Sequence, residues 1–300
     1  MATRYFLLDV FADVPFQGTQ IPVVVPERRL SDSEKLLIAS EFQKSETVFL
    51  DTANAEAPFS VYTDTRQTIF GAHTILAAAY IAHEMGLSQD QGAYTSFEIV
   101  QNRQPIKVFI DKVPDGIGSI QFARTIVPSI DRFTPSLSRI ANALGIDEKH
   151  ISFSKYRPMV VSVDNPTLII PFTRAEHVQA AKLNSESWSE LLSETYAANI
   201  FLFAPKSHKD IEDFHGRIVN PNVASNVFPP IGNVMPEFVA FLAEQKDTAD
   251  GTHTFSIDRG SEKTRKSVLH VEFDKRPGKS IQCRIGGRVV KMGVGTLLFP

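Results

Sequence analysis

The sequence carries a carboxylate and an imidazole at points where two regular elements are predicted to begin. Glu46 stands before the apolar run 47–50, which is typical of a β-strand, and His73 stands before the apolar run 75–82, which has the length of a helix. A carboxylate and an imidazole that face one pocket can move a proton on a bound substrate without a cofactor. The two residues are therefore the candidate catalytic groups.

The chemistry expected of Glu46 depends on how far its carboxyl group is removed from water. An unperturbed glutamate has a pKa of about 4.3. Enclosure among Val48, Phe49 and Phe70 would raise the pKa of Glu46 and let it exchange a proton near neutral pH. A Glu46 side chain that stays solvated where the strand begins would instead be an ordinary surface carboxylate.

His73 is predicted to lie in the first turn of its helix, where backbone N–H groups have no partner within the helix. That location disfavours a positive charge and keeps an imidazole neutral. A neutral histidine can donate a hydrogen bond to a substrate carbonyl or carboxylate, or relay a proton. The alternative is a histidine that only caps the helix or packs beside it.

A second group of candidates precedes a second apolar helix, predicted around 238–242. Gly232 and Asn233 can present backbone N–H groups and a side-chain amide to a substrate anion. Pro229 and Pro230 reduce the number of donors, so a plain turn is the other interpretation.

Phe228 comes just before these prolines and is interpreted as the wall of a pocket. An aromatic wall suits a larger, less polar ligand. Because the chain has 22 Phe residues, a plain core role is the alternative.

Composition excludes several classes of function. The 300 residues are enough for two domains, and the 43% hydrophobic content suits full cores. The net charge is −3, from 31 basic and 34 acidic residues, so neither nucleic acid nor a membrane surface is expected as a partner. No apolar run reaches the length of about 18 residues that a membrane helix needs.

The cysteine and histidine pattern points to a reducing compartment and no metal. Cys283 is the only cysteine, so an intramolecular disulfide and a two-thiol mechanism are both impossible. Residues 1–8 lead directly to Asp9, without the apolar core of a signal peptide. No His/Cys spacing resembles a zinc site. We therefore expect a cytoplasmic protein that uses no metal and no cofactor.

Periodicity and turn residues predict strands and helices in both halves of the chain. In the first half, Ser31–Glu34 has the spacing of a capping box that opens a helix, and the apolar helix runs over 74–84. Thr134 is the predicted cap of a helix with Pro135 at its first position and Gly145 as its end, and another helix begins near Ser187. The predicted strands are 7–11, 21–25, 47–50, 59–63, 97–100, 106–110, 160–163, 167–170, 199–204, 267–273, 280–285 and 288–292.

Each half thus contains one buried helix among strands, which predicts two domains with a cleft between them. We expect a first domain over 1–118, joined by the last strand 286–300, and a second domain over 119–285, with a linker between Val113 and Pro135. The candidate residues of the two halves would face each other across the cleft.

A series of short motifs matches one known family in order and spacing. The motifs are Asp9-Val10-Phe11, the turn Pro15-Phe16-Gln17-Gly18, the Ser-Glu-Thr-Val-Phe element 45–49, the segment 70–76 around His73, and the C-terminal segments 287–290 and 293–297. They resemble the PhzF-like proteins, the phenazine-biosynthesis branch of the diaminopimelate-epimerase fold. The chain departs from the family pattern at Thr19-Gln20, which replace Asn-Pro, and at Ala72, which replaces Gly.

The resemblance implies an α+β fold of two similar domains, each a curved mixed β-sheet or barrel wrapped around a central α-helix, and a homodimer. It implies that Glu46 shuttles a proton between carbons of the substrate. Phe228 stands where the family has an Asp, and in the family that Asp holds the substrate's polar group. Asn233 stands where the family has a Ser. The residues assigned to substrate binding are Ser45, Gly18, Thr19, Ala72, Thr74, Phe228, Gly232 and Asn233.

The predicted function is cofactor-independent isomerisation or epimerisation of a small metabolite, in the secondary metabolism that the resemblance implies. One alternative is a pericyclase-type cyclase that orients an apolar substrate for ring closure by positioning. Phe228 in place of the Asp favours that alternative. A small-molecule binding protein without catalysis is the other.

Overall fold

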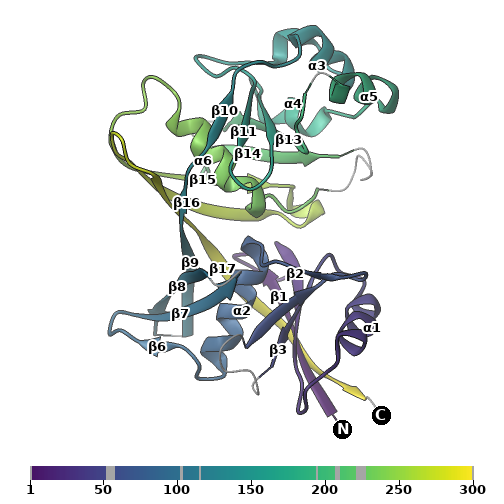
Figure 1. Ribbon diagram of the computed structural model, residues 1–300, viewed down its shortest axis with the longest axis vertical. Coiled ribbons are helices and arrows are strands. Elements are labelled where there is room, and N and C mark those ends of the chain that lie inside the picture. Colours follow the sequence, from purple (N-terminus) through teal and green to yellow (C-terminus); the bar gives the residue numbers. More distant parts are fainter. Residues whose placement is uncertain are drawn as a thin grey trace. The chain divides into compact units, whose positions relative to one another are not determined.

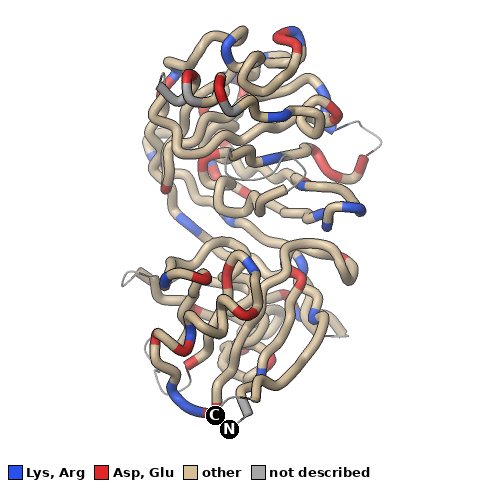
Figure 2. Tube along the Cα trace, turned by 90° about the vertical axis from the view of Figure 1, so that its right-hand side faces the viewer, with Lys and Arg blue, Asp and Glu red and all other residues tan. Residues whose placement is uncertain are grey.

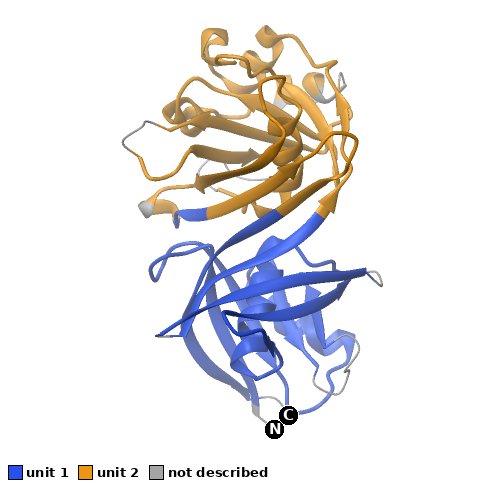
Figure 3. Cartoon of the chain, turned by 90° about the vertical axis from the view of Figure 1, so that its left-hand side faces the viewer, with its two compact units in different colours: residues 1–124, 265–268, 284–300 blue, residues 125–264, 269–283 orange. Residues whose placement is uncertain are grey.

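A computed structural model describes residues 2–51, 58–101, 104–114, 116–193, 195–206, 210–220 and 228–298. The chain divides into two compact units (Figure 3). The first unit comprises residues 1–124, 265–268 and 284–300, and the second comprises 125–264 and 269–283. The boundary falls within three strands, β9 (Gly116–Ile126), β16 (Ser267–Lys275) and β17 (Ile281–Leu298).

In the first unit, strands surround one apolar helix, α2 (Ala72–Glu84) (Figure 1). Every residue from Ala72 to Ala82 is buried, as the lack of a polar face predicts. The strands that pack against α2 are β1 (Ala2–Val10), β2 (Thr19–Val25), β3 (Thr47–Leu50), β7 (Tyr94–Gln101) and β8 (Gln104–Val113). This confirms the predicted strands and the central helix.

Strand order in the first unit follows from its connections. β1 pairs antiparallel with β2 and with β17, whereas β2 pairs parallel with β3 because α1 (Asp32–Phe42) crosses between them. The predicted capping box is present: Ser31 Oγ accepts from Glu34 N–H at 3.3 Å, and the Glu34 carboxylate accepts from Ser31 N–H at 2.8 Å. β4 (Phe59–Tyr62) pairs antiparallel with β3 and with β5 (Gln67–Thr68). β7 pairs antiparallel with β6 (Gln89–Asp90) and with β8, which in turn pairs antiparallel with β9.

The second unit also has a sheet, with parallel pairs at β12–β13 and β14–β15 and antiparallel pairs at β10–β11, β11–β12 and β13–β14. Its strands are β10 (Ser129–Asp131), β11 (Met159–Ser162), β12 (Thr167–Pro171), β13 (Asn199–Pro205), β14 (Phe214–Val219) and β15 (Gly251–Arg259). One face packs on α6 (Met235–Ala243), with Phe201 and Phe203 against Phe238 at ring-centre distances of 5.3 and 4.8 Å.

The opposite face of this sheet carries a second hydrophobic core. Ile200 and Leu202, which alternate with Phe201 and Phe203 along β13, point into that core as the period of a strand requires. Its helices are α3 (Leu137–Leu144), α4 (Ala175–Ala180) and α5 (Ser185–Ser193). Short 3₁₀ turns lie at Glu148–His150 and Glu262–Thr264.

Several predicted boundaries are wrong. α3 begins after Ser136, whose Oγ accepts from Arg139 N–H at 3.4 Å, so Thr134 and Pro135 lie outside the helix that they were predicted to open. Gly145 ends it as predicted, at φ +61°. The segment predicted as a linker contains β9 and β10. The strands predicted at 280–285 and 288–292 are one strand, β17, because Gly286 and Gly287 continue the ladder without a turn.

Charge is distributed over both units (Figure 2). None of the described helices is both long and apolar enough to cross a membrane.

One group of buried charges stabilises the second unit. Lys206 Nζ donates to Glu212 Oε2 and to Asp258 Oδ2, each at 2.7 Å, and Asp258 Oδ1 lies 2.6 Å from His215 Nδ1. The side chains of Glu212, Asp258 and His215 are at most 8% exposed. Burying a carboxylate is costly, and removing the cation from a buried ion pair leaves that cost uncompensated. The Lys206 ammonium therefore fixes the ends of β13, β14 and β15 relative to one another.

We expect Lys206→Met to lower the free energy of unfolding by about 3–5 kcal/mol, because it leaves two buried carboxylates without their shared cation. Urea denaturation followed by circular dichroism measures the change. Lys246→Met, at an exposed lysine of the same unit, is the control and should change stability by less than about 0.5 kcal/mol. Equal stability of the two variants would contradict the role given to Lys206.

Candidate functional site

Glu46 lies immediately before β3, the buried strand that pairs with β2 and β4. Burial raises the pKa of Glu46 to about 7. Among the described residues, none donates a hydrogen bond to its carboxyl group or forms an ion pair with it, so no interaction counteracts the cost of removing the charge from water. The direction of this shift is the one predicted from the apolar neighbours, and the carboxyl group is poised to exchange a proton near neutral pH.

His73 is the second residue of α2 and is 2% exposed. His73 packs on Phe11 edge to face, with the ring centres 5.0 Å apart and the ring planes at 85°. Phe11 follows β1 directly, so this contact places the imidazole at the C-terminal end of β1.

The start of α2 uses the hydroxyl group of Thr74. Thr74 Oγ1 accepts from Gly71 N–H at 2.9 Å and donates to the Gly71 carbonyl at 3.0 Å. Gly71 is the N-cap, and the buried Ala72 is the first helical residue. Thr74, predicted from the resemblance to bind substrate, therefore has a local role in fixing the helix terminus that carries His73.

The turn before β2 is held by an ion pair between a buried carboxylate and a partly exposed arginine. Asp9 is fully buried, pairs with Arg265 and accepts a hydrogen bond from Phe16 N–H at 2.9 Å. Arg265 Nε also donates to the Gly18 carbonyl at 3.1 Å. Arg265 was missed in the sequence because 256 residues separate it from Asp9. The Asp of the Asp-Val-Phe motif thus has a clear structural role in this chain.

Gly18 occupies a place that no other residue fits. Its φ is +68°, and a Cβ atom there would lie 2.3 Å from the Val10 carbonyl oxygen. Its N–H group donates to the Lys266 carbonyl at 2.7 Å. Thr19, the next residue, begins β2 opposite Val10.

The strand registers bring the candidate residues of the first unit to one end of the layer formed by β1, β2 and β3. Val10, at the C-terminal end of β1, pairs with Thr19, at the N-terminal end of β2. β3 runs parallel to β2 with Val48 beside Val23, so Ser45 and Glu46 lie at the same end of the layer. The contact of His73 with Phe11 places the imidazole there too.

A pocket of about 500 Å³ is lined in part by the segment that leads to α2. It is lined by residues of β4, β5 and the end of β7, namely Phe59, Ser60, Val61, Arg66, Gln67, Thr68, Ile69, Phe70, Val100 and Gln101. The Gln101 side chain accepts a hydrogen bond from Phe70 N–H at 2.6 Å, which fixes one wall of the pocket. Neither Glu46 nor His73 is among the lining residues.

The candidates of the second unit surround the start of α6. Gly232 is buried and Asn233 is exposed in the 3₁₀ turn Gly232–Val234, which continues directly into α6. The turn is held in place through Glu237, whose Oε1 accepts from Asp164 N–H at 2.8 Å and from Asn165 N–H at 3.1 Å. The backbone around Gly232 is therefore fixed by contacts with the turn between β11 and β12.

Phe228 lies against a buried cation. The guanidinium carbon of Arg217 is 4.8 Å from the centre of the Phe228 ring, and Arg259 Nη1 donates to the Phe228 carbonyl at 2.8 Å. Arg217, which is 2% exposed, uses Nη1 to donate to the carbonyls at the end of α4: Val178, Gln179 and Ala181 at 3.2, 3.0 and 2.9 Å. Carbonyl groups at a helix C-terminus favour such a cation. The ring therefore covers a fixed positive charge.

In the part of the chain that the structure describes, no group of three His, Cys, Asp or Glu side chains is placed to hold a metal ion.

Comparison with known proteins gives one family match and several similar structures. Residues 8–295 match the family described as phenazine biosynthesis-like protein. A protein of Mesorhizobium japonicum described as an uncharacterized isomerase is 27% identical, and the match covers 100% of both chains. A phenazine biosynthesis protein of the PhzF family from Bacillus anthracis is similar in structure at a TM-score of 0.83, with 20% identity and full coverage of both chains.

A more distant structure shares the fold. A hydroxyproline epimerase from Agrobacterium vitis, solved with bound trans-4-hydroxy-L-proline, is similar at a TM-score of 0.59 and 10% identity, over 99% of this chain and 91% of that one. Together with the PhzF structure, it shows that the fold is of the diaminopimelate-epimerase type, mixed α+β with strongly curved sheets, as predicted.

We expect the protein to lose stability, relative to Glu46→Gln, as the pH rises from 4.5 to 8. The folded state holds the pKa of Glu46 at about 7, above the ordinary value of 4.5, so its contribution is fully present below pH 4.5 and is lost as the pH rises through 7. The relative loss is about 3 kcal/mol. Urea denaturation of both proteins across this range measures it, and parallel pH profiles would contradict the burial of the carboxyl group.

We expect Phe228→Asp to be more stable than Phe228→Asn. The two replacements have nearly the same shape, but only the carboxylate can pair with the Arg217 guanidinium beneath it. Their difference in thermal midpoint should shrink as the pH falls below about 4, because the guanidinium lowers the pKa of the paired Asp and the carboxylate is protonated only progressively below that point. Equal midpoints at neutral pH would show that the Arg217 charge does not reach this position.

Proposed function

Because this chain belongs to the phenazine biosynthesis-like family, we propose that it is an isomerase that moves a proton on a small metabolite, with Glu46 as the acid and base. The observation that carries the proposal is the pKa of Glu46, which burial raises to about 7. A group with that pKa populates both protonation states at neutral pH, so it can remove a proton and return it within one catalytic cycle.

The proton transfer follows from this chemistry. The Glu46 carboxylate takes a proton from a carbon beside an electron-withdrawing group of the substrate, and the electron pair of the broken C–H bond moves into that group. Glu46, now a carboxylic acid, returns the proton to a different carbon, which isomerises the substrate. Return to the opposite face of the same carbon requires a second acid, and His73 is the candidate for it.

His73 and the start of α2 supply the stabilisation that the intermediate needs. Negative charge develops on the substrate when the proton leaves, and hydrogen-bond donors at that point lower the barrier. The imidazole lies in the first turn of α2, where the helix dipole favours an anion. No cofactor enters this scheme, because the electron pair stays on the substrate throughout.

The relatives support the class of reaction. The Mesorhizobium japonicum protein is described as an isomerase, and the Agrobacterium vitis structure is that of an epimerase. Both descriptions fit proton transfer at carbon. We extend the proposal to a small substrate of secondary metabolism, the context that the family name suggests.

A second candidate function is ring closure by positioning. Phe228 favours it, because the ring stands where the resemblance places a carboxylate and covers the Arg217 cation with an apolar surface. Such a cyclase would accelerate the reaction by holding an apolar substrate in a reactive conformation. A binding protein without catalysis is a third.

Incubation in heavy water with a pool of small metabolites from the producing cell separates these functions. We expect the native protein to form a deuterated or isomerised compound, detected by mass spectrometry. Glu46→Gln should form it at least about 100-fold more slowly, which is the usual contribution of a general base. Glu41→Gln, an exposed glutamate on α1, is the matched control and should behave as the native protein.

A new isomer without deuterium that all three proteins form at the same rate would rule out Glu46 as the base and favour ring closure by positioning. Saturable binding of one compound, with no new product, would favour the binding protein.

A further inference from the structure

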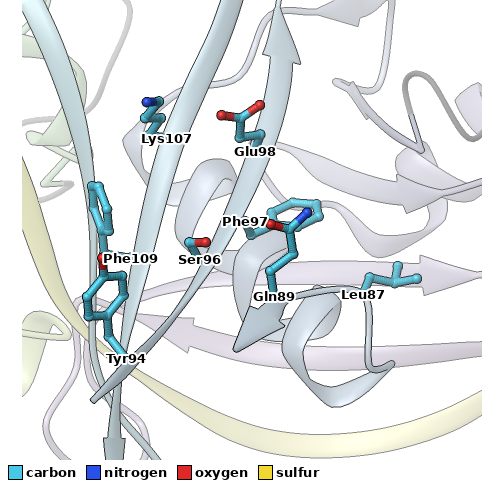
Figure 4. A pocket seen from close by; sticks show the side chains of 8 residues that line it. All are labelled: Leu87, Gln89, Tyr94, Ser96, Phe97, Glu98, Lys107 and Phe109. Carbon is cyan, nitrogen blue, oxygen red and sulfur yellow. The ribbon is translucent and has the colours of Figure 1, made fainter. Parts of the chain in front are cut away.

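The first unit has a pocket of about 490 Å³ on the hairpin of β7 and β8, apart from the proposed catalytic residues (Figure 4). Its lining residues come from the turn that follows α2 and from β6, β7 and β8. They are Leu87, Gln89, Tyr94, Ser96, Phe97, Glu98, Lys107 and Phe109.

The strand register places most of these side chains on one face. Ser96 pairs with Phe109, and Glu98 pairs with Lys107. Tyr94, Ser96 and Glu98 alternate along β7, so their side chains point to the same side of the hairpin. The pocket is therefore built on regular strands.

Leu87 is fixed at the far side of the pocket by the end of α2. Leu87 N–H donates to the Ala82 carbonyl at 2.7 Å, and Gly86 N–H donates to the His83 carbonyl at 3.0 Å. Gly86 has φ +71°, so the pattern is a Schellman motif, which turns the chain back over the helix. Leu87 stays 42% exposed, although it is apolar.

Aromatic rings form an apolar side of the pocket. Tyr94 and Phe109 meet edge to face, with ring centres 5.7 Å apart and planes at 70°. Tyr94 is 38% exposed, so much of its surface is open to a ligand. A further ring can pack against such a pair with a favourable edge-to-face geometry.

Opposite charges stand together at one end of the pocket. Figure 4 shows the Lys107 ammonium and the Glu98 carboxylate at the same end, with Ser96 between them and the ring of Tyr94. Although they are directly opposite across the ladder, no ion pair within 4 Å joins them to each other or to any other described residue. On the same hairpin, Lys112 does pair with Asp90, at 2.6 Å.

We propose that this pocket binds a free α-amino acid with an aromatic side chain. Lys107 would bind its carboxylate, Glu98 its ammonium group, and Tyr94 and Phe109 its ring. A simple acid or a simple amine would satisfy only one of the two charges, whereas an α-amino acid carries both groups on one carbon. The site shares no residue with the proposed proton-transfer chemistry and does not depend on it.

Titration of the full chain with L-phenylalanine, followed by amide NMR, tests the proposal. We expect saturable shifts at the amides of Ser96 and Phe109. Phenylpropionate, which lacks the ammonium group, phenylethylamine, which lacks the carboxylate, and L-alanine, which lacks the ring, should each bind at least about tenfold more weakly. Shifts at these two amides separate this site from binding elsewhere in the chain.

Lys107→Met and Glu98→Gln should each weaken phenylalanine binding at least about tenfold. Both residues are exposed, so the variants should fold, and their circular dichroism melting curves verify this. Lys246→Met is the matched control and should bind as the native protein does. The proposal is overturned if no saturable shift occurs at Ser96 and Phe109, or if the charge variants bind as tightly as the control.

Discussion

The enclosure of α2 is the constraint on which the first unit depends. The helix is buried on every side from Ala72 to Ala82, so strands must surround it, and the chain must supply them from both of its ends. This explains why β17, the last strand, pairs with β1. It also explains the location of the candidate site, because only the end of a fully enclosed helix can reach a ligand. His73 lies at that end, and the strand that begins after Glu46 approaches it from the same side.

Buried charges elsewhere in the molecule show why Glu46 is distinctive. Asp9 pairs with Arg265, Asp258 pairs with Lys206, and the Glu237 carboxylate accepts backbone N–H groups. Each of these groups offsets part of its loss of water with a charge or with donors, and each joins two distant segments. Among the described residues, none supplies a charge or a hydrogen-bond donor to the Glu46 carboxyl group. Burial therefore raises the pKa of Glu46. Burial also raises the pKa of Asp9 and Glu237, but their partners oppose that rise, and the partners of Asp258 lower its pKa. For Glu46 burial acts without such an opposing partner among the described residues.

The sequence was sufficient for features that depend on local physics. Continuous apolar runs located α2 and α6, and the Ser31–Glu34 spacing identified a helix cap that forms as expected. Prediction from the sequence failed where two local signals competed, or where interacting residues are far apart in the chain. Thr134-Pro135 and Ser136 are both acceptable caps, and the hydrogen bond from Arg139 decides for Ser136. The six residues of α4 are too few to show a helical period, and its end is fixed by Arg217, 36 residues away from Ala181. Of the site, the rise in the pKa of Glu46 was predictable from its apolar neighbours, whereas the role of Arg265 was not.

Phe228 lies against the Arg217 cation at the position where the resemblance places a carboxylate. Arg217 is required by the structure, because its guanidinium group satisfies the last carbonyls of α4, and so its charge is present whatever residue lies above it. A carboxylate at position 228 would neutralise that charge and present its remaining oxygen to a polar ligand. A phenyl ring instead covers the cation through its π-face and presents carbon. The phenyl ring thus adds no negative charge beside Arg217, and it offers no hydrogen-bond acceptor. The family's fold can therefore be retained while the surface presented near Phe228 becomes less polar.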